Sequence, residues 1–433
     1  MAEIRPFRAV RPAAAYAQRI AALPYDVYDE AEARKEAAAE PLSFLCIDRA
    51  ETQLPEGTSP YSDEVYQTAA ALFEKEQEEG YYVQEETPCY YIYSLTMDGR
   101  IQTGLAACSA VSDYLGGICK KHENTVVKKE EDRIRHVRAL AAQTGPIFLA
   151  YHKNEEISAL IAEKMQEPAL YDFTSADGIR HRVWKLAEPA VTARITELFE
   201  KKVPCTYIAD GHHRAASAVK AALALREAAD AKRGAEAENV SGPDAGRAHE
   251  YDYFLSVLFP DSELSIMDYN RVVKDLNGLT PEAFLGRAGE SFEIEALSEK
   301  DVPNEKPKKK GEFHVYLAGS WYCFRLKAAL SEARGQDAVK TLDVSALQEL
   351  ILEPLLGIKD PRTDERIEFV GGIRGIRILK EKADAYGGIA FSMHPTSIGE
   401  LMSVADAGRL MPPKSTWFEP KLRSGLLIHK LYD

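Results

Sequence analysis

The sequence predicts an α+β fold with a mixed sheet. Stretches typical of strands and of helices alternate irregularly along the 433 residues, without the regular strand–helix repeat of a parallel sheet. Two hairpins, at 89–111 and 312–326, add antiparallel pairs, and the first turns at Asp98-Gly99. A chain of this length is expected to hold two or three structural units around a large core.

Each predicted element follows from a local pattern. Short apolar runs predict strands at 89–95, 101–111, 145–151, 179–186, 203–209, 251–259 and 387–394. The stretch 116–125 predicts a short strand that continues into a charged loop. Helical periodicity predicts helices at 130–143, 190–200, 343–357 and 396–410. In the first of these, acidic residues precede basic ones, which matches the helix dipole. Asp343 is expected to cap the helix that begins there.

Composition excludes several classes of protein. The net charge of −14 argues against a nucleic-acid binder that relies on bulk positive charge. No window reaches the ~18 apolar residues of a membrane span, and the N-terminus has no apolar signal region. Six cysteines are scattered without CxxC spacing, which is typical of reduced thiols in a cytoplasmic protein.

The order of elements suggests four segments. We expect an N-terminal segment at 1–87, a central core at 88–225 that carries a phosphate motif, and a C-terminal α/β part at 251–433 that closes the site. Between the last two, 226–250 is rich in Ala, Glu and Gly and has no periodic large apolar residues. This composition predicts a mobile surface insertion.

The motif with the clearest chemistry is YIADGHHRAAS at 207–217. It reads as a strand, an Asp210-Gly211 turn and a helix that begins with His212, His213 and Arg214. The amides and the positive dipole end of a helix N-terminus favour an anion, and glycine lets the backbone approach it closely. The motif therefore predicts a phosphate cradle. Two alternatives stay open: Asp210 only caps the helix, or these residues hold a metal ion.

A second candidate region is KKHENTVVKKEEDRIRH at 120–136. Glu123 lies beside His122 after an apolar strand and could act as a general base toward a hydroxyl. Lys120 and Arg133 could supply positive charge for a phosphorylated ligand. The alternative is a solvated charged loop followed by a salt-bridged helix.

Two further motifs carry weaker signals. MPPKSTWFEPKLRSG at 411–425 contains prolines, an aromatic pair and basic residues, including Lys414, which is typical of a stiff binding loop. Alternatively, it is a tail that packs its aromatic residues on the core. In DYNRVVKDLNGL at 268–279, Asn270 could bind a ligand or cap a helix.

Several motifs together carry a family resemblance. They are RPFRAVRP, LPYDVY, GGICKKHENT, RHVRALAAQTGPIF, IADGHHRAASA, DYNRVVKDLNGL and MPPKSTWFEPKLRSGLLIH. In this order they resemble the bacterial domain-of-unknown-function family numbered ten-fifteen, over nearly the whole chain. That resemblance implies no activity.

A more distant resemblance does imply one. DGHHRAASA is similar to the phosphate motif of the ParB/sulfiredoxin superfamily, whose members include kinases of free serine. The resemblance implies a ParB/sulfiredoxin-like core with additional α/β segments. Sulfiredoxins have a reactive cysteine where this chain has His212, and ParB proteins add a DNA-binding domain that is not found here. The serine kinases share the Asp-Gly-His-His-Arg string and a preceding His-Glu pair, here His122-Glu123.

The resemblance implies a nucleotide-dependent phosphotransferase of serine metabolism that acts on free serine or a similar hydroxy acid and is reversible with phosphoserine. Glu123, with His122, would be catalytic, and ADP or ATP would lie against Gly211 to Arg214 with Mg²⁺ near Asp210. Lys120, Arg133 and Lys414 would bind the substrate. The alternatives are a phosphatase or phosphodiesterase that uses a histidine, or a nucleotide sensor without turnover. We expect no nucleic acid or membrane as a partner.

Overall fold

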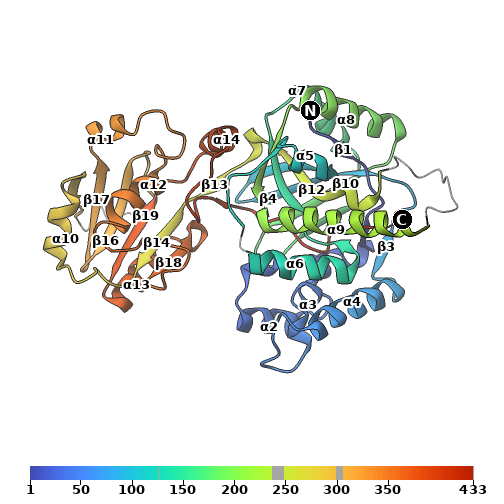
Figure 1. Ribbon diagram of the computed structural model, residues 1–433, viewed down its shortest axis with the longest axis horizontal. Helices are drawn as coiled ribbons and strands as arrows, with labels where there is room; N and C mark the ends of the chain where they lie inside the picture. The colour runs from blue at the N-terminus through green and yellow to red at the C-terminus, as the bar shows by residue number, and fades with distance from the viewer. Residues whose placement is uncertain (126, 237–247, 299–305, 433) are drawn as a thin grey trace. The chain divides into compact units, whose positions relative to one another are not determined.

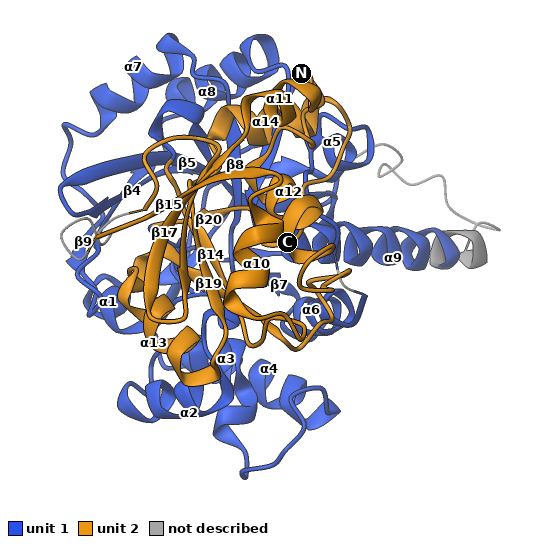
Figure 2. Ribbon diagram, turned by 90° about the vertical axis from the view of Figure 1, so that its left-hand side faces the viewer, with its two compact units in different colours: residues 1–264, 420–433 blue, residues 265–419 orange. Residues whose placement is uncertain are grey.

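The computed structural model describes residues 1–125, 127–236, 248–298 and 306–432. The chain forms two compact units, one of residues 1–264 and 420–433 and the other of residues 265–419 (Figure 2). Each unit has its own sheet. The predicted α+β fold with a mixed sheet is confirmed, because the larger sheet combines parallel and antiparallel pairs. Within the described residues, no helix is both long and apolar enough to cross a membrane.

The first unit is built on a sheet in the order β6-β11-β8-β12-β5-β4-β10-β9, with β1 paired to β5. Its strands are β1 (Ile4–Arg5), β4 (Tyr90–Met97), β5 (Arg100–Ala110), β6 (Cys119–Lys120), β8 (Ile147–Tyr151), β9 (Tyr171–Thr174), β10 (Arg180–Leu186), β11 (Thr206–Asp210) and β12 (Tyr253–Pro260). The pairs β11–β6 and β12–β8 are parallel. Apolar residues in nearly every position of β8 and β12 explain why both strands are completely buried.

Helices cover this sheet and form a second small core. They are α1 (Ala17–Ile20), α2 (Glu30–Ala39), α3 (Leu45–Asp48), α4 (Asp63–Glu78), α5 (Val111–Leu115), α6 (Val127–Leu140), α7 (Glu155–Lys164), α8 (Pro189–Lys202) and α9 (His212–Glu236). Figure 1 shows α6 and α9 running along one another, with α2, α3 and α4 beyond α6. The apolar faces of α2 to α4 pack on Leu140 of α6 and on Ile428 near the C-terminus.

Two short strand pairs fasten the ends of the first unit. β2 (Val10–Pro12) pairs with β3 (Tyr82–Gln84), and β7 (Ala142–Gln143) pairs with β21 (His429–Lys430). The second pair joins the residues that follow α6 to the segment that returns after the second unit. The C-terminal segment is therefore part of the first unit's structure.

The second unit has an antiparallel sheet in the order β15-β17-β16-β19-β14-β18. Its elements are β13 (Ile266–Met267), β14 (Tyr269–Val273), α10 (Pro281–Ala288), β15 (Phe292–Ala296), β16 (Glu312–Leu317), β17 (Ser320–Leu326), α11 (Ala328–Ala333), α12 (Asp343–Leu347), β18 (Ile367–Gly371), α13 (Arg377–Tyr386), β19 (Ile389–Met393), α14 (Ile398–Asp406) and β20 (Trp417–Phe418). The predicted hairpin at 312–326 is confirmed as β16–β17.

Two predicted helix caps are wrong. Asp343 does not cap α12, whose N-cap is Leu342; its carboxylate instead accepts the Gly311 amide at 3.0 Å. Asn270 lies within β14, where its carboxamide oxygen accepts the Met393 amide at 2.9 Å. Both side chains satisfy backbone donors distant in the sequence, which a local pattern does not reveal.

The units differ from the predicted segments. Strand β12, predicted within the 251–433 part, lies between β8 and β5 in the first unit, and residues 420–433 belong to that unit as well. The predicted insertion at 226–250 begins as helix, because α9 continues to Glu236. Residues 237–247 lie outside the described residues.

Packing at Gly425 yields a stability prediction. Gly425 has a φ of 76°, and a Cβ there would overlap the buried Phe44 ring. Gly425→Ala should lower the free energy of unfolding by about 2–4 kcal/mol, because overpacking adds to the left-handed backbone strain. Urea unfolding followed by circular dichroism measures this loss.

Gly178→Ala is the matched control, because Gly178 has a φ of 81° and no atom within 4 Å of its Cβ position. Gly178→Ala should lower the free energy of unfolding by only about 1–2 kcal/mol, because it adds left-handed backbone strain but no overpacking. Equal losses in the two variants would contradict the packing described here.

Candidate active site at the β11–α9 turn

The sharp turn between β11 and α9 brings the predicted anion site together. Asp210 ends β11, Gly211 has a φ of 94°, and α9 begins at His212. The left-handed backbone at Gly211 favours glycine, and a Cβ there would lie 3.1–3.2 Å from the Arg214 guanidinium, which is a tight contact. The first bond of the turn runs from the Ala215 amide to the Gly211 carbonyl. The amides that precede Ala215 therefore point out of the helix end.

The Asp210 carboxylate is the charged centre of this turn. Its Oδ1 accepts the Gly211 amide at 2.9 Å, and its Oδ2 lies 3.1 Å from Lys421 Nζ and 3.8 Å from the Arg214 guanidinium. Burial raises the pKa of Asp210, but the positive charges of Lys421 and Arg214 outweigh it and hold the pKa below its usual range. Asp210 is therefore ionised at neutral pH and fixes two cations at the helix N-terminus.

Arg214 is held from both ends of its guanidinium. Its Nη1 donates to the Pro146 carbonyl at 2.6 Å, and its Nη2 faces Asp210. Only 14% of the side chain is exposed. An arginine fixed in this way can meet an anion with little further loss of conformational freedom.

Two buried histidines lie on the other side of the turn. The His122 amide donates to His212 Nε2 at 3.5 Å, and the two rings meet edge to face with centroids 4.5 Å apart. Burial lowers the pKa of His122 to about 4, and burial together with the positive form of His122 lowers that of His212 well below its usual value. Both imidazoles are therefore neutral at neutral pH.

Glu123 lies at the edge of this histidine pair. Its Oε2 is 3.8 Å from His212 Nδ1, and 36% of its side chain is exposed. When His212 accepts at Nε2, its Nδ1 carries the proton and faces Glu123. The structure thus brings His122, Glu123 and the helix N-terminus together, although they are about 90 residues apart in the sequence.

The three residues predicted to bind substrate lie in different places. Arg133, on α6, is buried and lines a cavity together with Arg214. Lys120 belongs to β6, the strand next to β11, and its ammonium lies 5.5 Å from the centre of the Tyr207 ring. Lys414 belongs to the second unit, where its carbonyl accepts from Arg271.

Two residues that lie here, Lys421 and Asp48, were not predicted from the sequence as site residues, although Lys421 is one of the basic residues of the 411–425 motif. Lys421 lies in the same motif as Lys414, but the chain has re-entered the first unit at 420. Asp48 ends α3 and shares the cavity with Arg133 and Arg214. The signal for Asp48 was an acidic residue directly after an apolar run, Phe-Leu-Cys-Ile.

The chain belongs to the family described as "Protein of unknown function (DUF1015)", whose model matches residues 4–345. The family predicted from the sequence motifs is therefore confirmed. Among curated proteins, no sequence matches this chain.

Several solved structures are distantly similar. A free serine kinase in complex with AMP has 14% identity and a TM-score of 0.33, with 73% of this chain and 86% of that chain covered. A conserved hypothetical protein from Pyrococcus furiosus has 13% identity and a TM-score of 0.33 over 74% and 93% of the two chains. SbnI from Staphylococcus aureus has 10% identity and a TM-score of 0.37 over 73% and 85%. These similarities are too distant to transfer an activity.

The position of Arg214 yields a binding prediction. Arg214→Ala should weaken ADP binding more than tenfold, because a charge-assisted contact of a buried group is worth roughly 1.5–3 kcal/mol. Isothermal titration of the folded variant measures the change. Arg194→Ala is a control, because Arg194 is a half-exposed residue of α8. An unchanged ADP affinity in Arg214→Ala would remove the anion site.

The low pKa of His122 yields a pH prediction. A histidine with a pKa of about 4 when folded and about 6.5 when unfolded stabilises the protein above pH 6.5, and this contribution is lost as the pH falls toward 4. The unfolded chain then binds a proton that the folded chain does not, which costs up to about 1.4 kcal/mol per pH unit. His122→Gln should make the decline of stability between pH 6.5 and 5 less steep in urea unfolding. An identical slope would show that His122 is not buried in its neutral form.

Proposed function

We propose that this protein is a cytoplasmic nucleotide-dependent phosphotransferase with a ParB/sulfiredoxin-like core. It transfers a phosphoryl group between ADP or ATP and the hydroxyl of free serine or a similar hydroxy acid. The observation that carries the proposal is the β11–α9 turn, where a helix N-terminus, Arg214 and Lys421 converge beside Glu123. Phosphoryl transfer needs mainly positioning and neutralisation of charge, which this arrangement supplies.

The turn is the part that would hold the nucleotide phosphates. Gly211 allows close approach of the backbone, and the amides of His212, His213 and Arg214 point out of the helix end. The Arg214 guanidinium adds a fixed positive charge. Lys421 completes a pair of cations whose charge Asp210 only half neutralises.

Mg²⁺ would be held mainly by the nucleotide phosphates, with Asp210 as a candidate protein ligand, because the Gly211 amide and Lys421 already engage the two Asp210 oxygens. Among the described residues, no group of three or more His, Cys, Asp or Glu side chains is arranged to hold a metal ion. Asp210 is a single, partly exposed carboxylate, and Mg²⁺ commonly binds one or two carboxylates together with phosphate oxygens. Bound in this way, Mg²⁺ would neutralise charge on the transferred group.

Glu123 would act as the general base. It would accept the proton of the substrate hydroxyl while the oxygen–phosphorus bond forms and the bond to the nucleotide breaks. Neutral His212, with Nδ1 toward Glu123, would orient the carboxylate, and His122 would hold His212 through its amide. The low pKa values of both histidines disfavour the alternative of a phosphatase that uses one of them as an acid at neutral pH.

Removal of the base tests the proposal. Glu123→Gln should leave ADP binding nearly unchanged and reduce turnover by about 10²–10⁴, the usual range for the loss of acid–base catalysis. ³¹P NMR would follow serine with ATP, and phosphoserine with and without ADP. Release of inorganic phosphate without ADP would indicate a phosphatase.

Glu131→Gln is the matched control, because Glu131 is an exposed residue of α6. It should keep turnover within about twofold, as expected for a solvated surface substitution. Full activity in Glu123→Gln would remove the proposed base. If the wild-type protein binds ADP but shows no turnover with either nucleotide, the result would favour a nucleotide sensor.

A further inference from the structure

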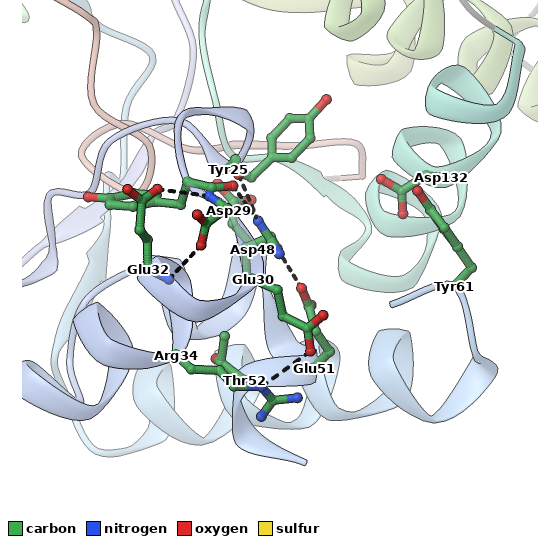
Figure 3. Close-up of polar contacts among 12 residues, drawn as sticks. Tyr25, Asp29, Glu30, Glu32, Arg34, Asp48, Glu51, Thr52, Tyr61 and Asp132 are labelled. Atoms are coloured by element: carbon green, nitrogen blue, oxygen red, sulfur yellow. Dashed lines mark hydrogen bonds and ion pairs between the residues drawn. The ribbon is translucent and has the colours of Figure 1, made fainter. Parts of the chain in front are cut away.

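Asp48 lies where two cavities of the first unit share a wall. The first, which is small, extends to Arg214 and Ser217 on α9. The second, which is larger, extends between α3, α4 and α6 to Tyr61 and Asp132. Both are lined by the same four residues: Tyr25, Asp48, Arg133 and His136. In Figure 3, Tyr25 and Asp48 lie on one side of the second cavity, and Asp132 and Tyr61 lie on the other.

The Asp48 carboxylate pairs only loosely with Arg133. It is 5% exposed, and its Oδ1 lies 3.9 Å from Arg133 Nη1, 3.7 Å from His136 Nε2 and 3.4 Å from the Thr144 hydroxyl. His136 does not supply a charge, because burial lowers its pKa to about 3. Burial also raises the pKa of Asp48. The Ser424 side chain also hydrogen-bonds to this carboxylate. Hydroxyl partners do not neutralise its charge, so a buried carboxylate whose nearest guanidinium nitrogen is 3.9 Å away favours a further positively charged group beside it.

Arg133 is fixed beside Asp48 but is paired with another residue. Its Nε and Nη2 contact Asp132 at 2.9 and 2.8 Å, and its guanidinium lies over the Tyr25 ring at 3.9 Å from the centroid. Its Nη1 lies no closer than 3.9 Å to Asp48. One end of the guanidinium can therefore still receive a carboxylate.

The second cavity selects against polyanions. Its lining includes four acidic residues and three basic ones, namely Asp26, Asp48, Glu51 and Asp132 against Arg49, Lys129 and Arg133. Arg49 also has little capacity left for an anionic ligand, because it pairs with Glu51 and donates to the Tyr25 and Tyr28 carbonyls. A nucleotide would meet net negative charge here, whereas a small molecule with an ammonium group would be attracted.

We infer that the shared wall of these cavities binds the zwitterionic head of a free α-amino acid, with its ammonium at Asp48 and its carboxylate at Arg133 Nη1. The inference rests on the proposed function for the role of this amino acid as the phosphoryl acceptor. It narrows the substrate class, because a hydroxy acid without an ammonium group adds no positive charge beside the buried Asp48, which is then left with hydroxyl partners and the loosely paired Arg133. Thr144, which already approaches Asp48, supplies a hydroxyl to the same ammonium.

Binding measurements on the wild-type chain test the inference without any variant. Isothermal titration should detect L-serine, whereas D-glycerate, which lacks the ammonium, and ethanolamine, which lacks the carboxylate, should bind at least tenfold more weakly. Equal binding of D-glycerate and L-serine would overturn the role of Asp48. An absence of L-serine binding at millimolar concentrations would overturn the subsite.

Variants locate the subsite. Asp48→Asn should weaken L-serine binding at least tenfold and keep ADP affinity within twofold. Asp48→Glu, which keeps the negative charge, should retain more of the L-serine affinity than Asp48→Asn. Asp63→Asn, at an exposed residue of α4, should change neither affinity. Unchanged L-serine affinity in a folded Asp48→Asn protein would contradict the assignment.

The outcomes separate this inference from the proposed function. Binding of L-serine that depends on Asp48, without phosphoryl transfer, would support the subsite and reject the phosphotransferase. Phosphoryl transfer to D-glycerate as efficient as transfer to L-serine would support the phosphotransferase and reject the subsite.

Discussion

The ion pairs of Asp210 connect three distant parts of the first unit. The carboxylate stands at the end of β11, Arg214 lies in the first turn of α9, and Lys421 comes from the segment that follows the second unit. Without this carboxylate, two cations would face each other beside a helix N-terminus, whose dipole already carries positive charge. Asp210 therefore allows positive charge to accumulate at the turn while the site is empty of anions.

The neutral histidines and the charged turn have complementary roles. His122 and His212 are buried, and their low pKa values keep them from adding charge. The histidine pair therefore adds no positive charge to the turn at neutral pH, where Asp210 faces Arg214 and Lys421. Glu123, at the edge of the pair, is partly accessible to solvent.

The sequence predicted the local parts of this site well. An apolar strand followed by Asp210-Gly211 and a helical pattern specifies the turn through backbone conformation alone, and the structure has these elements in that order. The Asp210–Lys421 contact joins residues 211 positions apart, and no local pattern encodes it. The same holds for β12 between β8 and β5, because sheet order depends on tertiary packing. Asp48 was missed because an acidic residue after an apolar run is usually a surface position.

The insertion of residues 265–419 within the first unit has a consequence for biosynthesis. A ribosome releases the segment that carries Lys421 and β21 only after the entire second unit has been translated. Until then, Asp210 lacks one of its cations and β7 lacks its partner strand. The nascent first unit therefore lacks these two contacts while the second unit is being translated. The Asp210–Lys421 contact at the candidate site can form only after residues 265–419 have been made.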